Sequence, residues 1–136
     1  MERSFAARSW TADTVAKTLG VIFIIVGILG FFPNPLVSYR GFFEVNTFHN
    51  IVHIVSGGIL LASPYYNMPV MTLRVFGVIY AIVTFLGFIS LGSLEAMGMA
   101  ANQPDNWLHL VIALVLLWTG FAMTAEDTDR VTTAHL

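Results

Sequence analysis

Four long runs of apolar residues alternate with short polar or turn-forming segments along the chain. The runs cover approximately residues 12–32, 47–63, 72–94 and 105–124. Each comes close to the ~20 helical residues that cross the hydrocarbon core of a bilayer. The longest connection, residues 33–45, leaves no room for a soluble domain. The pattern predicts a single all-α integral membrane domain over residues 1–136, with four membrane-spanning helices.

The first and third runs have related sequences, and so do the second and fourth. KTLGVIFIIVGILGFF (17–32) aligns without gaps on RVFGVIYAIVTFLGFI (74–89), with eight identical residues out of sixteen. NIVHIVSGGILL (50–61) aligns on NWLHLVIALVLL (106–117), which pairs both an asparagine and a histidine. The repeat unit is therefore a helical hairpin, approximately 12–63 and 72–124.

A hairpin of two spans returns to the side of the membrane from which it started. The two copies should thus have the same orientation and be related by a pseudo-two-fold axis along the membrane normal. Short loops make sequential helices antiparallel neighbours. We expect a four-helix up-down-up-down transmembrane bundle built from two parallel hairpin repeats.

Two matched pairs of glycines are the expected contacts between these helices. Gly20 and Gly30 in the first run align with Gly77 and Gly87 in the third. Small residues let helix backbones approach closely in lipid, where the hydrophobic effect does not drive helices together. We predict that these four glycines mediate helix packing.

Composition and charge support a membrane location and set its sidedness. The chain is 57% hydrophobic and 10% charged, far from an ordinary soluble domain. The net charge of −2 gives no signal for nucleic acid, and the absence of cysteine excludes disulfides and thiolate metal sites. Five basic residues lie on one side of the predicted bundle, against Arg40 alone on the other: Arg3, Arg8, Lys17, Arg74 and Arg130. The positive-inside rule then places both termini in the cytoplasm, and the expected location is a bacterial inner membrane or an internal photosynthetic membrane.

Polar side chains gather at the start of the second and fourth runs, at matching depths. They are His49, Asn50, His53, Asp105, Asn106 and His109. A spacing of four residues places His49 and His53 on one helix face, and does the same for Asp105 and His109. This cluster is the candidate functional site.

Three interpretations of the cluster remain open. In the first, the asparagines and histidines hydrogen-bond between helices, and Asp105 or Thr47 caps a helix. In the second, His53 and His109, with His49 as a further candidate, hold a divalent metal ion or a tetrapyrrole such as haem or chlorophyll. In the third, the histidines and Asp105 handle protons or ions, although no ionisable residue deep in the first or third run continues such a path.

The cluster and the first apolar run resemble a known protein family. FHNIVHIVSGGILL and DNWLHLVIALVLL are similar to that family's Asn-x-x-His and Asp-Asn-x-x-His span starts, and LGVIFIIVGILGFF to its opening span. The family consists of small bacterial four-span proteins known as a domain of unknown function, and the resemblance covers approximately residues 15–122. It implies four spans and important roles for Asn50, His53, Asp105, Asn106 and His109, and it implies no activity.

The small loops and absent polar pathway leave helix faces as nearly the whole functional surface. We therefore expect a non-enzymatic accessory or scaffold subunit of a larger bacterial membrane complex, respiratory or photosynthetic. Its contacts would be lipids and either other integral membrane proteins or further copies of itself. The alternative is a cofactor-binding bundle that uses His53 and His109 as ligands, and a second alternative is proton or ion handling.

Overall fold

The computed structural model describes residues 11–123, and within this range the protein is mostly helical. Its long helices are α1 (Ala12–Leu29), α2 (Thr47–Ala62), α3 (Pro69–Ile89) and α5 (Gln103–Leu117). A 3-10 turn, η2 (Ser63–Tyr66), follows α2, and a π-helical stretch, η3 (Trp118–Met123), continues α5. The short elements are α4 (Leu91–Ala96) and the two-residue strands β1 (Val37–Ser38) and β2 (Phe43–Glu44).

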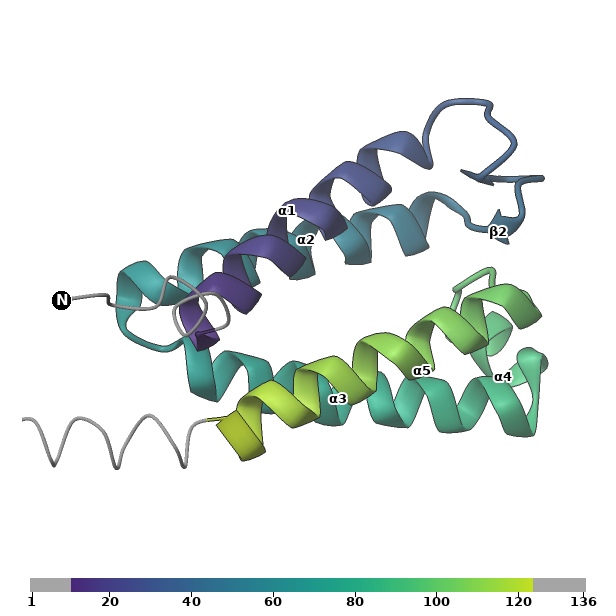
Figure 1. Cartoon of the computed structure of the whole chain (residues 1–136). Helices are drawn as coiled ribbons and strands as arrows, with labels where there is room; N and C mark the ends of the chain where they lie inside the picture. Colours follow the sequence, from purple (N-terminus) through teal and green to yellow (C-terminus); the bar gives the residue numbers. More distant parts are fainter. Residues whose placement is uncertain (1–10, 124–136) are drawn as a thin grey trace, which may run out of the picture.

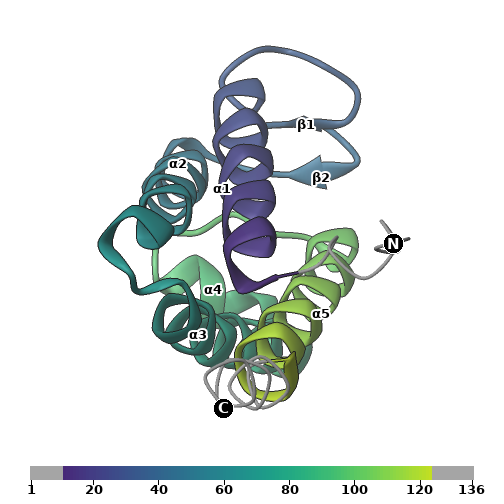
Figure 2. The ribbon, with the colours of Figure 1, turned by 60° about the vertical axis from the view of Figure 1, so that its left-hand side comes forward.

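The four long helices form two closely packed pairs. Helix α1 lies along α2, and α3 lies along α5 (Figure 1). Contacts between the pairs are fewer and run mainly through α1, α2 and α3. In the turned view, the four helices surround a common centre, with β1 and β2 to one side of α1 (Figure 2). The strand segment and α4 lie at the same end of the molecule, opposite η2.

Three of these helices are long and apolar enough to cross a membrane. They are Ala12–Leu29, Pro69–Ile89 and the continuous helical segment Gln103–Ala122, with mean hydropathies of 1.9, 2.0 and 1.4. Helix α2 has 16 residues and is shorter than a typical span. The prediction of a mostly helical protein with apolar helices of membrane-spanning length is confirmed. Three of the described helices, rather than four, reach that length.

Two segments differ from the simple pattern of runs and loops. The third apolar run, approximately 72–94, is interrupted at Ser90, whose extended backbone (φ −163°, ψ 122°) ends α3 and precedes α4. Ser90 is the N-cap residue of α4, and serine favours that position over a helix interior. In the connection 33–45, β1 pairs in parallel with β2, matching Val37 to Phe43.

A single asparagine organises that connection. The side-chain oxygen Oδ1 of Asn34 accepts from the backbone N–H groups of Leu36 (3.0 Å) and Val37 (2.7 Å). Its amide nitrogen donates to the carbonyl oxygens of Leu29 and Val37. The end of α1 and the first strand are thereby joined through one side chain, so the segment is more ordered than a plain turn.

The helix pairs pack through close backbone approaches at glycine. A side-chain carbon added at Gly20 would lie 2.7 Å from the backbone nitrogen of Leu61 on α2. At Gly77 it would lie 2.9 Å from the side chain of Leu117 on α5. The apolar core extends between the pairs, and its fully buried members include Phe23, Leu60, Leu73 and Leu116.

Candidate metal centre

The site is built where α2 and α5 begin, and both helices begin in the same way. The Asn46 side chain caps α2 by accepting from the backbone N–H of His49 (2.9 Å). The Asn102 side chain caps α5 by accepting from Asp105 N–H (3.2 Å), and Asp105 accepts in return from Asn102 N–H (3.0 Å). The alternative cap at Thr47 is therefore wrong, because the asparagine one residue earlier has the extended backbone that a cap requires.

Each capping asparagine also reaches across to the other helix pair. Asn46 Nδ2 donates to the carbonyl oxygen of Gly98 (2.9 Å), just after α4. Asn102 Nδ2 donates to the carbonyl oxygen of Phe42 (2.9 Å), just before β2. The two donors are 56 residues apart, and so are the two acceptors. These two equivalent bonds hold together the segments that surround the histidines.

Three histidines meet inside the bundle. His49 and His53 come from successive turns of α2, and His109 comes from α5. Their side chains are 1%, 5% and 2% exposed. One ring nitrogen from each lies within 4.8 Å of those of the other two, a geometry able to hold a metal ion. We call this group the histidine triad.

The protonation of His49 follows from its hydrogen bond. Its Nδ1 lies 2.7 Å from the carbonyl oxygen of Ala100. A carbonyl oxygen can only accept, so Nδ1 carries the hydrogen and, in the neutral ring, Nε2 carries a free lone pair. That Nε2 accepts a hydrogen bond from Nε2 of His53 (3.0 Å). His49 is thus oriented with its lone pair toward the centre of the triad.

The other two rings hold buried nitrogens without partners. Nδ1 of His53 and Nδ1 of His109 make no hydrogen bond to any described group. An unsatisfied buried polar group costs about 1–3 kcal/mol. The triad therefore carries an energetic cost in the protein alone, which a ligand could offset.

Aromatic side chains form the inner wall of the site. Phe23 of α1 meets His53 edge to face, with ring centroids 5.2 Å apart, and Tyr80 of α3 meets His109 in the same manner at 5.8 Å. Phe23 and Tyr80 also touch each other, with centroids 5.4 Å apart. These two rings pack against the imidazoles of His53 and His109 and restrict their orientation.

A small cavity adjoins the triad. Its volume is about 50 Å³. A water molecule occupies about 30 Å³ in the liquid, whereas pockets for drug-sized ligands have about 300–1,000 Å³. The cavity can accept a metal ion with a small ligand and is too small for a larger molecule. Its lining consists of the triad with Val52, Ser56, Ile79, Tyr80, Val83 and Met99.

The predicted polar cluster is divided in the structure. Asn50 and Asn106 lie away from the triad, packed against the backbone at Gly30 and Gly87, where an added side-chain carbon would collide with their amide groups. Asn106 Nδ2 donates to the carbonyl oxygen of Gly87 (3.0 Å). The Asp105 carboxylate belongs to the capping box.

Sequence reasoning missed several residues of the site. Asn46 and Asn102 could have been found, because extending the alignment of the second and fourth runs by four residues toward the N-terminus pairs them. Met99 and the carbonyl of Ala100 come from a loop, and no periodic pattern signals them. Tyr80 aligns with Phe23, but an aromatic residue in an apolar run does not stand out.

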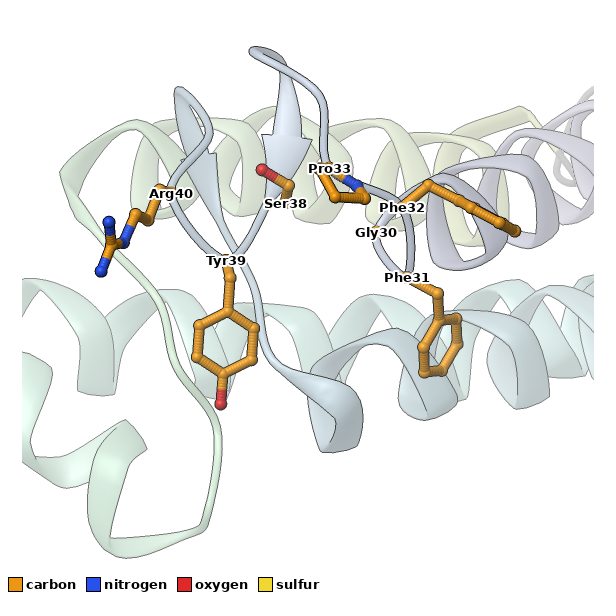
Figure 3. Close-up of a pocket in the computed structure, with 7 residues that line it drawn as sticks. All are labelled: Gly30, Phe31, Phe32, Pro33, Ser38, Tyr39 and Arg40. Carbon is orange, nitrogen blue, oxygen red and sulfur yellow. The ribbon is translucent and has the colours of Figure 1, made fainter.

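A second hollow lies at the connection after α1 and has a volume of about 360 Å³. Tyr39 and Phe31 lie on the same side of this segment, and the Arg40 side chain points away from both (Figure 3). The remaining lining residues are Gly30, Phe32, Pro33 and Ser38. No set of convergent polar groups marks it as a binding site, and the histidine triad stays the candidate centre.

Comparison with known proteins gives a family without an activity. Residues 13–122 match the family described as domain of unknown function DUF4383. No curated protein and no solved structure matches the chain. The match covers most of the chain and confirms the resemblance noted in its span starts. The chain belongs to the DUF4383 family.

Proposed function

We propose that the protein is a small integral membrane protein that binds one transition-metal ion through His49, His53 and His109. The observation that carries the proposal is the convergence of three buried imidazoles whose ring nitrogens lie within 4.8 Å of one another. Neutral imidazole is the commonest side-chain ligand for metals of this class. Three histidines on facing helices of a bundle form a recurrent type of cofactor site.

One nitrogen–nitrogen distance within the triad is close to the separation of two ligands on one ion. Two nitrogens that each lie about 2.0–2.1 Å from a tetrahedral ion are about 3.3 Å apart. Nε2 of His49 and Nε2 of His53 are 3.0 Å apart. The three ring nitrogens lie within 4.8 Å of one another, so binding requires the rings to move closer together by up to about 1.5 Å.

The bond from His49 to Ala100 supports the same reading. Histidines that bind metals usually donate their second ring N–H to a carboxylate or a backbone carbonyl, which fixes the tautomer and the ring orientation. His49 Nδ1 does this with the carbonyl oxygen of Ala100 at 2.7 Å. The ring is held with its free nitrogen directed at the proposed ion.

Size favours an ion over the tetrapyrroles considered above. Haem and chlorophyll are at least as large as drug-sized ligands, which need several hundred Å³, and the cavity beside the triad has about 50 Å³. Three converging nitrogens also exceed the one or two axial positions of a tetrapyrrole metal. The metal ion alone is the ligand that this packing supports best.

The proposal includes a specific membrane arrangement. Helix α2 with η2 spans residues 47–66 and would serve as a fourth span, giving the up-down-up-down bundle of two hairpin repeats. The two equivalent bonds from Asn46 to Gly98 and from Asn102 to Phe42 support the repeat. With cytoplasmic termini in a bacterial inner or photosynthetic membrane, the triad would lie near the outer end.

Metal analysis of the purified full chain tests the proposal. After mild detergent extraction, separate samples are dialysed against Zn²⁺ and against Co²⁺ salts. We expect one ion per chain in each, and the visible absorption of tetrahedral Co²⁺ in the cobalt sample. His53→Ala and His109→Ala should abolish binding. His135→Ala, which removes the remaining histidine of the chain, is the matched control and should leave the ion in place. A metal-free wild-type protein would contradict the proposal.

The role as an accessory or scaffold subunit is a second candidate. It is supported by apolar side chains that are exposed on separate helices, such as Ile25 on α1, Ile82 on α3 and Leu114 on α5. These faces can contact lipid, another integral membrane protein or a second copy of the chain. Crosslinking in intact membranes, followed by mass measurement, should show a larger assembly. A protein that is monomeric throughout would rule this role out.

A further inference from the structure

We propose that the bound ion is monovalent copper, Cu(I), and that the thioether sulfur of Met99 is its fourth ligand. This inference rests on the proposed metal site and specifies its chemistry. Two independent features of the site carry it: a buried methionine on the cavity wall, and the absence of negative charge among the residues that line the cavity.

Met99 is placed at the cavity by the loop after α4. Gly98 has a left-handed backbone (φ 83°), which favours glycine and turns the chain back toward the bundle. The backbone N–H of Met99 then donates to the carbonyl oxygen of Leu94 (3.0 Å). The Met99 side chain is 7% exposed and lines the cavity beside the three histidines. It is the one sulfur-containing residue in that lining.

The same loop is tied directly to the triad. Ala100 follows Met99, and its carbonyl oxygen accepts from His49 Nδ1. Gly98 precedes Met99, and its carbonyl oxygen accepts from the cap residue Asn46. Met99 is therefore held between two bonds to the start of α2, so its position relative to His49 is fixed on both sides.

The charge of the site favours a monovalent ion. Neutral imidazoles and a thioether add no negative charge, and none of the residues that line the cavity is acidic. The free energy required to desolvate an ion grows with the square of its charge. This cost is therefore about four times larger for a divalent ion than for a monovalent one of the same size. The nearest carboxylate along α5 is Asp105, one helical turn before His109, and it could balance one positive charge.

The softness of the ligands points to the same metal. Thioether sulfur prefers soft ions such as Cu(I), whereas Zn²⁺ readily completes its shell with water or carboxylate oxygen. Three imidazoles and a thioether also satisfy Cu(I) without oxidation of the protein, once His53 moves its ring hydrogen from Nε2 to Nδ1. The site as built matches this ion better than it matches Zn²⁺.

The test uses the full chain, purified in mild detergent without oxygen and kept reduced. Cu(I) is titrated against the chromophoric chelator bicinchoninate, and Zn²⁺ against a separate chromophoric chelator. X-ray absorption is recorded on the Cu(I)-loaded wild type. We expect one Cu(I) per chain with a shell of three nitrogens and one sulfur.

Met99→Leu removes the sulfur and keeps the side-chain volume. It should weaken Cu(I) binding at least about tenfold and remove the sulfur shell, while Zn²⁺ affinity changes less than about twofold. Met97→Leu is the matched control, because Met97 lies in the same loop with its side chain 53% exposed. It should change neither affinity.

The outcomes separate this inference from the function on which it rests. Cu(I) bound with a shell of nitrogen alone, or a wild type that binds Zn²⁺ but not Cu(I), would overturn the copper–thioether inference and leave the metal site intact. Equal losses of Zn²⁺ and Cu(I) affinity in Met99→Leu would do the same. A wild type that binds neither ion would overturn both. The X-ray absorption measurement uses the wild type, so the inference can be tested even if the Met99→Leu variant folds poorly.

Discussion

Helices α2 and α5 begin alike and then use equivalent positions differently. Each is capped by an asparagine that also bonds to the other helix pair, and each carries an asparagine against a glycine and a histidine one turn further on. At the third helical position, α2 has His49 and α5 has Asp105. His49 joins the triad, whereas Asp105 completes a capping box. The proposed repeat thus supplies the pair His53 and His109, and one difference between its copies supplies the third ligand.

Making α2 resemble α5 at this position should have the largest effect. His49→Asp removes the ligand that is held by Ala100 and leaves two imidazoles. We expect metal affinity to fall at least about a hundredfold, because losing a first ligand should exceed the 10–100-fold typical of its supporting partners. The measurement is competitive chelator titration of the purified protein. The variant should remain helical by circular dichroism, since Asn46 still caps α2. Because an aspartate can itself bind a metal ion, His49→Ala is measured beside it, and unchanged affinity in both variants would show that His49 is not a ligand.

The paired glycines test whether the two halves pack equivalently. Gly30→Ala and Gly87→Ala each place a methyl group against an asparagine amide. We expect each to lower the free energy of unfolding by about 1–3 kcal/mol, as overpacking does, in a detergent unfolding titration. Gly58→Ala is the matched control, because nothing lies within 4 Å of the added carbon. It should be neutral or slightly stabilising. A large loss in one half alone would contradict equivalent packing.

Removing the caps probes the bonds that cross between the halves. Asn46→Ala and Asn102→Ala each lose a helix cap and one bond to the opposite loop. We expect each to cost about 1–2 kcal/mol in thermal or detergent unfolding. Asn46→Asp keeps the capping oxygen and loses only the amide donor, so its cost should be smaller. If Asn46→Asp costs as much as Asn46→Ala, the cap contributes nothing and the cross-bond carries the whole effect.

The smallest expected effect concerns the charge on α5. Asp105→Asn preserves an oxygen for the capping box and removes the negative charge near the helix start. The charge gains about 0.3–1 kcal/mol from the helix dipole. Burial of the carboxylate disfavours its charged form, so the net change in stability should be less than about 1 kcal/mol. Metal affinity of this variant can be measured in the same titration. A stability loss above that of Asn102→Ala would show that Asp105 does more than cap the helix.

Sequence patterns located the helices and the polar residues of the site, because both follow from local periodicity and from the rarity of polar residues in spans. They did not distinguish His49 from Asp105, since both occupy the same helical position relative to the matched histidines. His49 is distinguished from Asp105 by its hydrogen bond to the backbone carbonyl of Ala100. The position of a backbone group in a loop cannot be predicted from the pattern of side chains. The break at Ser90 was hidden for a related reason: apolar residues continue on both sides of it.

The route of the loop from α4 to α5 also has a consequence for synthesis of the protein. His49 and His53 are made early, but the carbonyl that orients His49, the Met99 side chain and His109 all come from the last third of the chain. The first hairpin alone therefore holds two imidazoles without their partners. The proposed metal centre can be completed only after α5 has been made and has packed against α2, so an occupied site would report that the whole bundle has assembled.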